Sequence, residues 1–128
     1  MLKNGQMWLD DAGDPIQAHG GNIIRYENKW YWYGEHKGAA NTPGLQRVDF
    51  IGISCYSSEN LLDWHYEGLA LKAEEAGSGH MLEPKNVIER PKVVYNKKTK
   101  QFVMWMHADT ADYVYGGIGV AVSKTPTG

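Results

Sequence analysis

The sequence predicts an all-β fold assembled from a four-stranded unit that occurs twice. Short runs of aromatic and β-branched residues alternate with turn residues along the whole 128-residue chain. The 15 glycines, 8 tyrosines and 5 tryptophans suit short strands joined by tight turns. Only the stretch around residues 70–76 is a candidate helix, and Gly77-Ser78-Gly79 cuts it short.

The first unit spans about residues 16–68 and contains four predicted strands. These strands cover residues 22–26, 30–35, 48–57 and 63–68. A polar turn at 27–29 joins the first two, and a loop at 36–47, rich in Gly, Ala, Asn and Pro, joins the second to the third. Four strands in this order form an antiparallel meander.

The second unit begins at about residue 88 and repeats the same order. Its predicted strands cover residues 90–95, 101–107 and 117–123. Aligning Trp30 with Phe102 gives an offset of 102 − 30 = 72 residues between the two aromatic strands. Because the strands keep their order while the loops vary, the repeat is that of a structural unit rather than of a short motif.

Four-stranded units that recur around a central channel are the pattern of a β-propeller. Propellers have about four to eight such blades, whereas residues 1–128 hold roughly two, the second of which, at about 88–128, is incomplete. We therefore expect a partial β-propeller domain. The faces and edges that two blades leave exposed are expected to be covered by the remaining blades of the same protein or by another copy.

The charge distribution argues against two classes of partner. The net charge is −2, from 13 basic and 15 acidic residues spread along the chain without a basic stripe. No nucleic-acid or anionic-membrane partner is therefore expected, and no run approaches the about 20 apolar residues of a membrane span. Cys55 is the only cysteine, which excludes an internal disulfide, and its apolar surroundings predict a buried, inert thiol.

Residues that carry chemistry are expected where the innermost strand of each blade opens at the channel mouth. These regions are 17–21 in the first unit and 88–92 in the second. In the second region Glu89 precedes Arg90, and a carboxylate beside a guanidinium accepts hydrogen bonds from sugar hydroxyls while the positive charge keeps it ionised. A surface ion pair explains the same two residues equally well.

Four further residues have both a ligand interpretation and a structural one. Glu35, at the end of an aromatic strand, either reaches a ligand past Gly34 or is a solvated strand end. His107, its approximate counterpart, is better explained as a hydrogen-bonded structural histidine than as a ligand contact. His19 either donates to a ligand or caps a loop carbonyl, and Tyr113 is either a stacking platform for a sugar ring or part of a strand pattern. The five histidines show no metal-ligand spacing, so no metal site is predicted.

Five motifs, in a consistent order over nearly the whole chain, together resemble glycoside hydrolase family 43. The nearest branch is that of the exo-β-1,3-galactanases. The motifs are IQAHGG at 16–21, WYWYGE at 30–35, CYSS with LLDW between 55 and 64, ERPKV at 89–93 and VMWMH at 103–107. Each motif is weak alone, and their combination carries the resemblance.

The resemblance implies a five-bladed propeller that hydrolyses a β-galactoside with inversion at the anomeric carbon. Inversion needs an acid and a base about 6.5–9.5 Å apart. The family's general acid is a glutamate of a later blade, beyond Gly128, so the isolated chain is expected to be inactive. The usual base is an aspartate on the first inner strand, where this sequence reads Gln17-Ala18-His19-Gly20. The galactanase branch is similar in lacking that aspartate, and the base stays unassigned.

By the same resemblance, Glu89 matches the carboxylate that orients the acid, tunes its pKa and binds ring hydroxyls, and is neither acid nor base. An ionised Glu89 near the acid would raise the pKa of that acid, which agrees with this role. Arg90 and Tyr113 match positions that line the subsite of the terminal galactose. No cofactor is required; many members carry a structural calcium on the propeller axis, and no ligand set for it can be identified in the sequence.

The expected partner is galactan or another plant polysaccharide or oligosaccharide. The expected location is secreted or periplasmic, although no signal peptide is visible at the N-terminus. Two other functions stay open: a different activity of the same family, on an arabinofuranoside or a xyloside, and a non-catalytic carbohydrate-binding module. The missing aspartate counts against the first, whereas stacking aromatics serve binding as well as catalysis.

Overall fold

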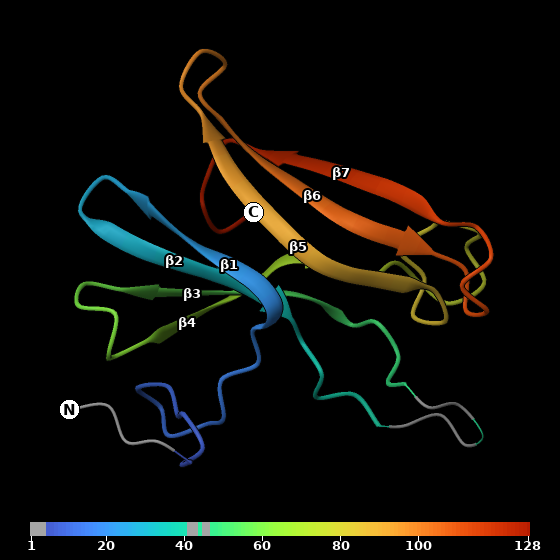
Figure 1. Ribbon diagram of the computed structural model, residues 1–128, viewed down its shortest axis with the longest axis horizontal. Coiled ribbons are helices and arrows are strands. Elements are labelled where there is room, and N and C mark those ends of the chain that lie inside the picture. Colours follow the sequence, from blue (N-terminus) through green and yellow to red (C-terminus); the bar gives the residue numbers. More distant parts are fainter. Residues whose placement is uncertain (1–4, 41–43, 45–46) are drawn as a thin grey trace.

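The computed structural model describes residues 5–40, 44 and 47–128, and these form two antiparallel sheets without a helix. The first sheet has the order β1-β2-β3-β4 and the second the order β5-β6-β7. The strands are β1 His19–Tyr26, β2 Lys29–Glu35, β3 Gly52–Ser58, β4 His65–Lys72, β5 Val87–Asn96, β6 Gln101–Asp109 and β7 Gly117–Ser123. Figure 1 shows the sheets side by side, with β1 and β5 at their adjoining edges. The all-β prediction is confirmed.

The clearest difference from the sequence prediction concerns residues 70–76, which do not form a helix. Residues 70–72 are the end of β4, where Lys72 pairs with Gly52 of β3. Ala70 and Leu71 pack against the core from this strand. Pairing with β3 and burial therefore override the local helix preference of an alanine-rich stretch. The described residues accordingly contain no helix that could cross a membrane.

Five of the seven predicted strands begin elsewhere, and the largest shifts are those of β1, β3 and β5. β1 begins at His19, three residues before its predicted start. The third begins at Gly52 rather than at residue 48. Positions 41–43 and 45–46 of the predicted loop before it lie outside the described residues. β5 begins at Val87, three residues before its predicted start, because a bulge lets the strand continue through Pro91. Proline, which lacks an N–H, is tolerated in a strand at such a bulge.

The hydrophobic core lies between the two sheets. Its buried residues are Tyr33, Phe50, Ile53, Cys55, Ile88, Val93, Phe102, Met104, Met106 and Ala108. Tyr26, Tyr95 and Phe102 add an aromatic cluster, with ring centroids 4.7 to 4.9 Å apart. Burial of a phenylalanine side chain contributes about 1.5–3 kcal/mol, so these contacts hold the sheets against each other.

Cys55 belongs to this core. It is a free thiol with no exposed surface. Burial raises the pKa of Cys55 to about 12, so the thiol stays protonated at neutral pH. The predicted buried, inert cysteine is confirmed.

A single side-chain amide joins the backbones of β1 and β5. Asn22 Nδ2 donates to the carbonyl oxygen of Val93, and the Val93 N–H donates to Asn22 Oδ1, both at 2.9 Å. The amide supplies one donor and one acceptor. It therefore satisfies both backbone groups of Val93, in place of the backbone partner that a neighbouring strand would provide. This contact fixes the position of one inner strand along the other.

The face of the second sheet that points away from the core is apolar and exposed. It carries Val94, Trp105, Ile118, Val120 and Val122, each at least half exposed. Trp105 and Val120 are cross-strand partners on this face. A contiguous apolar patch of this kind is typical of a surface on which another part of a protein packs.

Candidate active site

The inner strand of each sheet carries a bulge close to its first residues. The bulge of β1 contains Gly20 and Gly21, and that of β5 contains Arg90 and Pro91. The φ angles are 64° at Gly20 and 54° at Arg90, so both residues are left-handed. This conformation costs a residue with a Cβ about 1–2 kcal/mol, a cost that applies to Arg90 and not to the glycine. Bulges of this kind re-aim side chains beside active sites.

The strand register makes the two bulges equivalent. His19 precedes the first bulge and pairs with Glu35, and Glu89 precedes the second and pairs with His107. The register therefore gives the correspondence between Glu35 and His107 that the sequence predicts. The two bulges also lie against each other, since the position of a Cβ on Gly20 would be 3.8 Å from Arg90 Cα.

Glu35 is a buried carboxylate that connects the two sheets. It ends β2 and is 6% exposed. Its Oε1 accepts the backbone N–H of Arg90 at 3.0 Å, and its Oε2 lies 2.5 Å from Lys37 Nζ. Gly34 permits this packing because a Cβ there would collide with the backbone of Ala18. The solvated strand end that was one interpretation of Glu35 is therefore wrong.

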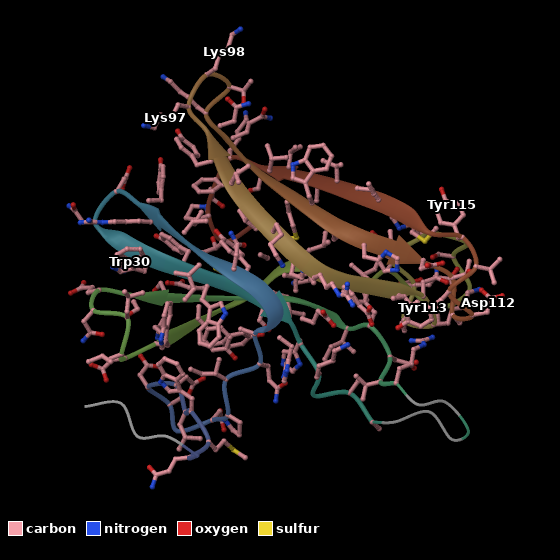
Figure 2. All side chains as sticks on the ribbon, viewed as in Figure 1. Trp30, Lys97, Lys98, Asp112, Tyr113 and Tyr115 are labelled. Atoms are coloured by element: carbon pink, nitrogen blue, oxygen red, sulfur yellow. The ribbon has the colours of Figure 1, made fainter. Side chains whose placement is uncertain are left out.

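Glu89 is held by the loop between β6 and β7. The Tyr113 hydroxyl donates to Glu89 Oε1 at 2.9 Å. The Tyr113 ring stacks on His107, with centroids 6.2 Å apart and planes at 14°. Burial, and after it the Glu89 carboxylate, raises the pKa of Tyr113, so the hydroxyl remains a donor. Figure 2 shows Tyr113 at the end of the sheet opposite to the turn that carries Lys97.

The imidazole beneath Tyr113 is oriented by a buried carboxylate. His107 Nε2 lies 3.1 Å from Asp109 Oδ2, and Asp109 is 1% exposed. Burial alone would raise the pKa of Asp109, but hydrogen bonds from loop backbone N–H groups, with a smaller contribution from His107, lower it overall. The carboxylate therefore stays ionised and fixes the plane of the ring on which Tyr113 stacks.

His19 lies at the start of β1 and contacts a side-chain amide. Its Nε2 is 3.0 Å from Gln17 Oε1, which also accepts the Lys37 N–H at 3.2 Å. Because an amide oxygen only accepts, this contact assigns the proton to His19 Nε2. Burial, followed by the positive charge of a protonated His19, lowers the pKa of the adjacent His36. The partner of His19 is thus not the loop carbonyl that one interpretation expected.

Glu35 and Glu89 line one narrow pocket between the two sheets, together with Asn86 and Arg47. Within the described ranges no ion pair joins Glu89 to Arg90, and the surface ion pair that could explain these residues is wrong. Arg90 meets Glu35 through its backbone N–H instead, and its side chain is exposed. Among the described residues the guanidinium therefore makes no ion pair that would keep Glu89 ionised, contrary to the sequence prediction.

Comparison with solved structures decides the family. An exo-β-1,3-galactanase from Phanerochaete chrysosporium, solved with β-1,3-galactotriose, is 39% identical at a TM-score of 0.88, over 99% of this chain and 28% of that one. A β-1,3-galactosidase of glycoside hydrolase family 43, solved with galactodeoxynojirimycin, is 42% identical at a TM-score of 0.83, over 99% and 36% of the two chains. The chain belongs to glycoside hydrolase family 43.

An exo-β-1,3-galactanase from Clostridium thermocellum is similar as well, at 40% identity and a TM-score of 0.81, over 99% of this chain and 25% of that one. The chain thus spans between 25% and 36% of the length of these three structures. No family model matches the chain, and no match was found among curated proteins. The sheets β1–β4 and β5–β7, called blade one and blade two from here on, are part of the family 43 five-bladed propeller.

Sequence reasoning missed three charged residues at this candidate site. Lys37 and Asp109 each stand two residues after a predicted residue, Glu35 and His107. Alternate residues of a strand share a face, which was a signal for Asp109 in β6, whereas Lys37 lies beyond the end of β2 and had no such signal. Lys92 stands two residues after the predicted residue Arg90 as well, but no local signal indicated its contact with the Gly20 carbonyl oxygen, at 2.7 Å.

A structural calcium, which the family resemblance raised, finds no ready ligand set here. Among residues 5–40, 44 and 47–128, no three His, Cys, Asp or Glu side chains gather in a way that could hold a metal ion. The described part of blades one and two therefore does not fit a calcium site built from such side chains.

Proposed function

We propose that the whole protein carrying this chain is a glycoside hydrolase that releases galactose from the ends of β-1,3-galactan. The observation that carries the proposal is the set Glu35, Glu89, Arg90 and Tyr113 at the adjoining bulges of two blades. This set stands in a chain that is 34–42% identical to family 43 galactanases and galactosidases. The galactotriose and galactose bound in the P. chrysosporium structures support a galactan ligand.

Glu89 is proposed to hold the terminal galactose. The Tyr113 hydroxyl occupies Oε1, which leaves Oε2 to accept a hydrogen bond from a ring hydroxyl. The exposed guanidinium of Arg90 is proposed to supply further donors to the sugar, and the Tyr113 ring an aromatic face. Glu35 acts indirectly, because both of its oxygens are engaged by Arg90 and Lys37.

Inverting hydrolysis is proposed for the reaction. An acid protonates the leaving oxygen while a base activates water on the opposite face of the ring. On this proposal the acid is a carboxyl group of another blade, and the charge of Glu89 raises the pKa of that acid so that it stays protonated. The chemistry uses carboxyl groups and water and requires no cofactor.

The 128-residue chain alone is proposed to be inactive, because the family resemblance implies a general acid on a later blade, beyond Gly128. Incubation of the purified chain and of the whole protein with β-1,3-galactan tests this. Galactose is expected from the whole protein only. Turnover by the isolated chain would contradict the assignment.

Substrate choice is tested with three aryl glycosides: a β-galactoside, an α-arabinofuranoside and a β-xyloside. The whole protein is expected to cleave the galactoside at least about a hundredfold faster, because a site built to hydrogen-bond a given hydroxyl strongly rejects a sugar that lacks it. Preference for either pentoside would replace the galactanase proposal with another activity of family 43.

A binding module without catalysis predicts a different result for Glu89→Gln. Calorimetric titration of the whole protein with galacto-oligosaccharides, alongside turnover, separates the two. The enzyme proposal expects the variant to lose both affinity and turnover. A wild-type protein that binds galacto-oligosaccharides without releasing galactose would support the binding module.

A further inference from the structure

The ammonium of Lys92 contacts three backbone carbonyls at the junction of the two blades. Its Nζ donates to Gly20 O at 2.7 Å and to Arg90 O and Pro91 O at 3.3 Å. An ammonium has three donors and no acceptor, so three carbonyl oxygens satisfy it. Two of these carbonyls belong to the left-handed residues Gly20 and Arg90.

Lys92 is the counterpart of Asn22 in the strand register, since each residue resumes pairing directly after its bulge. Asn22 extends from blade one to the backbone of Val93 in blade two. Lys92 extends in the opposite direction, from blade two to the backbone of Gly20 in blade one. The inner strands are therefore joined by two reciprocal side-chain contacts, one neutral and one charged.

Arg90 is held at both ends of its own backbone by charged side chains. Its N–H donates to Glu35 Oε1 at 3.0 Å, and its carbonyl oxygen accepts from Lys92 Nζ at 3.3 Å. A residue with a Cβ keeps a left-handed conformation only where its surroundings determine it. Glu35 and Lys92 provide those surroundings for Arg90.

We propose that Lys92 is a positioning residue for sugar binding: its contacts with the carbonyls of Gly20, Arg90 and Pro91 keep Arg90 left-handed, with its guanidinium at the mouth of the site. The inference rests on the proposed galactan hydrolysis. Without the ammonium, Arg90 relaxes toward ordinary φ values, and its guanidinium leaves the subsite. Affinity for the terminal galactose then falls, while the acid and base, on other residues, still act.

A structural role in joining the blades is the competing explanation. It predicts that loss of Lys92 lowers stability without a specific effect on the sugar. The positioning role predicts that the effect on the sugar depends on the residue at position 90. If that residue is glycine, there is neither a guanidinium to place nor a strained backbone to hold.

The test compares Lys92→Met with Lys97→Met in the whole protein, with a β-1,3-galactobioside as substrate. Lys97 is a matched control on the exposed turn between β5 and β6, at the far end of blade two (Figure 2). Lys92→Met is expected to raise KM about fivefold and to change kcat less than about twofold, and Lys97→Met to change neither. In an Arg90→Gly background, Lys92→Met is expected to change KM less than about twofold.

An unchanged KM in Lys92→Met, or the same increase in both backgrounds, contradicts the positioning role. A crystal structure of Lys92→Met gives a second readout. If Arg90 is still left-handed there, with its guanidinium in place, the positioning role of Lys92 is wrong. If Lys92→Met does not fold, Lys92→Arg takes its place, because a planar guanidinium keeps the charge but cannot direct donors at three carbonyls in this way. A wild-type protein that releases no galactose would instead overturn the proposed function.

Discussion

The inner strand of blade one carries His19-Gly20-Gly21-Asn22 near its start, and that of blade two carries Glu89-Arg90-Pro91-Lys92 near its own. Both segments bulge at the same place in the register and turn through a left-handed residue. In blade one that residue is glycine and needs no support. In blade two it is an arginine, held by a carboxylate and an ammonium from either side.

The difference between the two bulges is that blade two has a strained backbone at Arg90, whereas blade one has a glycine at the equivalent position. A glycine provides the same backbone path at lower cost but places no side chain at the channel mouth. Arg90 carries an exposed side chain at the equivalent position, and the carboxylate of Glu35 and the ammonium of Lys92 offset the cost of its conformation. Strained residues cluster at functional sites, so the strained Arg90 supports the proposal that blade two contacts the sugar.

The greatest loss of stability is expected from replacing Gly21, where β1 and β2 approach each other too closely for a side chain. A Cβ at Gly21 would collide with the Tyr33 carbonyl oxygen. Because backbone must move, Gly21→Ala is expected to cost more than about 4 kcal/mol or to prevent folding. The measurement is the denaturant midpoint and soluble yield of the whole protein.

The control is Gly13→Ala, at a glycine that has a positive φ, unlike Gly21, but open space around the position of a Cβ. It is expected to cost about 1–2 kcal/mol. Equal losses in the two variants would mean that the close approach to Tyr33 does not matter.

The next largest loss of stability is expected from removing the carboxylate of Glu35, which contacts the backbone of the other blade. Glu35→Ala removes the acceptor of the Arg90 N–H and the partner of Lys37. Leaving such groups unpaired is expected to cost about 1–3 kcal/mol, measured by chemical denaturation. Glu75→Ala, on an exposed loop, is the control and is expected to stay within about 0.5 kcal/mol of wild type. A Glu35→Ala variant as stable as that control would show that Glu35 does not support the bulge.

Replacing Arg90 by the glycine found at the equivalent position of blade one is expected to have a smaller effect, which raises stability but lowers sugar affinity. Arg90→Gly removes the left-handed strain at φ 54° and is expected to gain up to about 1 kcal/mol of stability. The same variant loses the guanidinium, so its affinity for galacto-oligosaccharides is expected to fall. Thermal unfolding and calorimetry measure the two effects, and a variant that loses stability would show that Arg90 is not strained.

The smallest expected effect is a pH dependence of stability in blade two. Asp109 has a pKa below its ordinary value of 3.8, so its contribution is present above that value and is lost as the pH falls through the lowered pKa. Asp109→Asn removes this dependence. The stability difference between wild type and variant is therefore expected to narrow between about pH 5 and about pH 2, as followed by thermal unfolding. A constant difference over this range would contradict the assignment.

The sequence predicted the all-β repeat and the residues at the start of each inner strand, because aromatic strands and turn residues are local signals. It did not predict that β4 would extend through Ala70 and Leu71, since pairing with β3 decides that. Nor did it predict the Glu35–Arg90 contact, which joins residues 55 positions apart and exists only because the two sheets pack with their bulges adjoining. Lys92 was missed for the same reason: its main partner, Gly20, is 72 residues away.

Glu89 is proposed to hold the sugar and to keep the proton on an acid elsewhere in the propeller. The most direct measurement is the pH dependence of kcat/KM for galactose release by the whole protein and by Glu89→Gln. Loss of a nearby negative charge lowers the pKa of the acid, so the alkaline limb of the variant is expected to move to lower pH by roughly one unit or more. A variant with the alkaline limb and turnover of wild type would contradict the role assigned to Glu89.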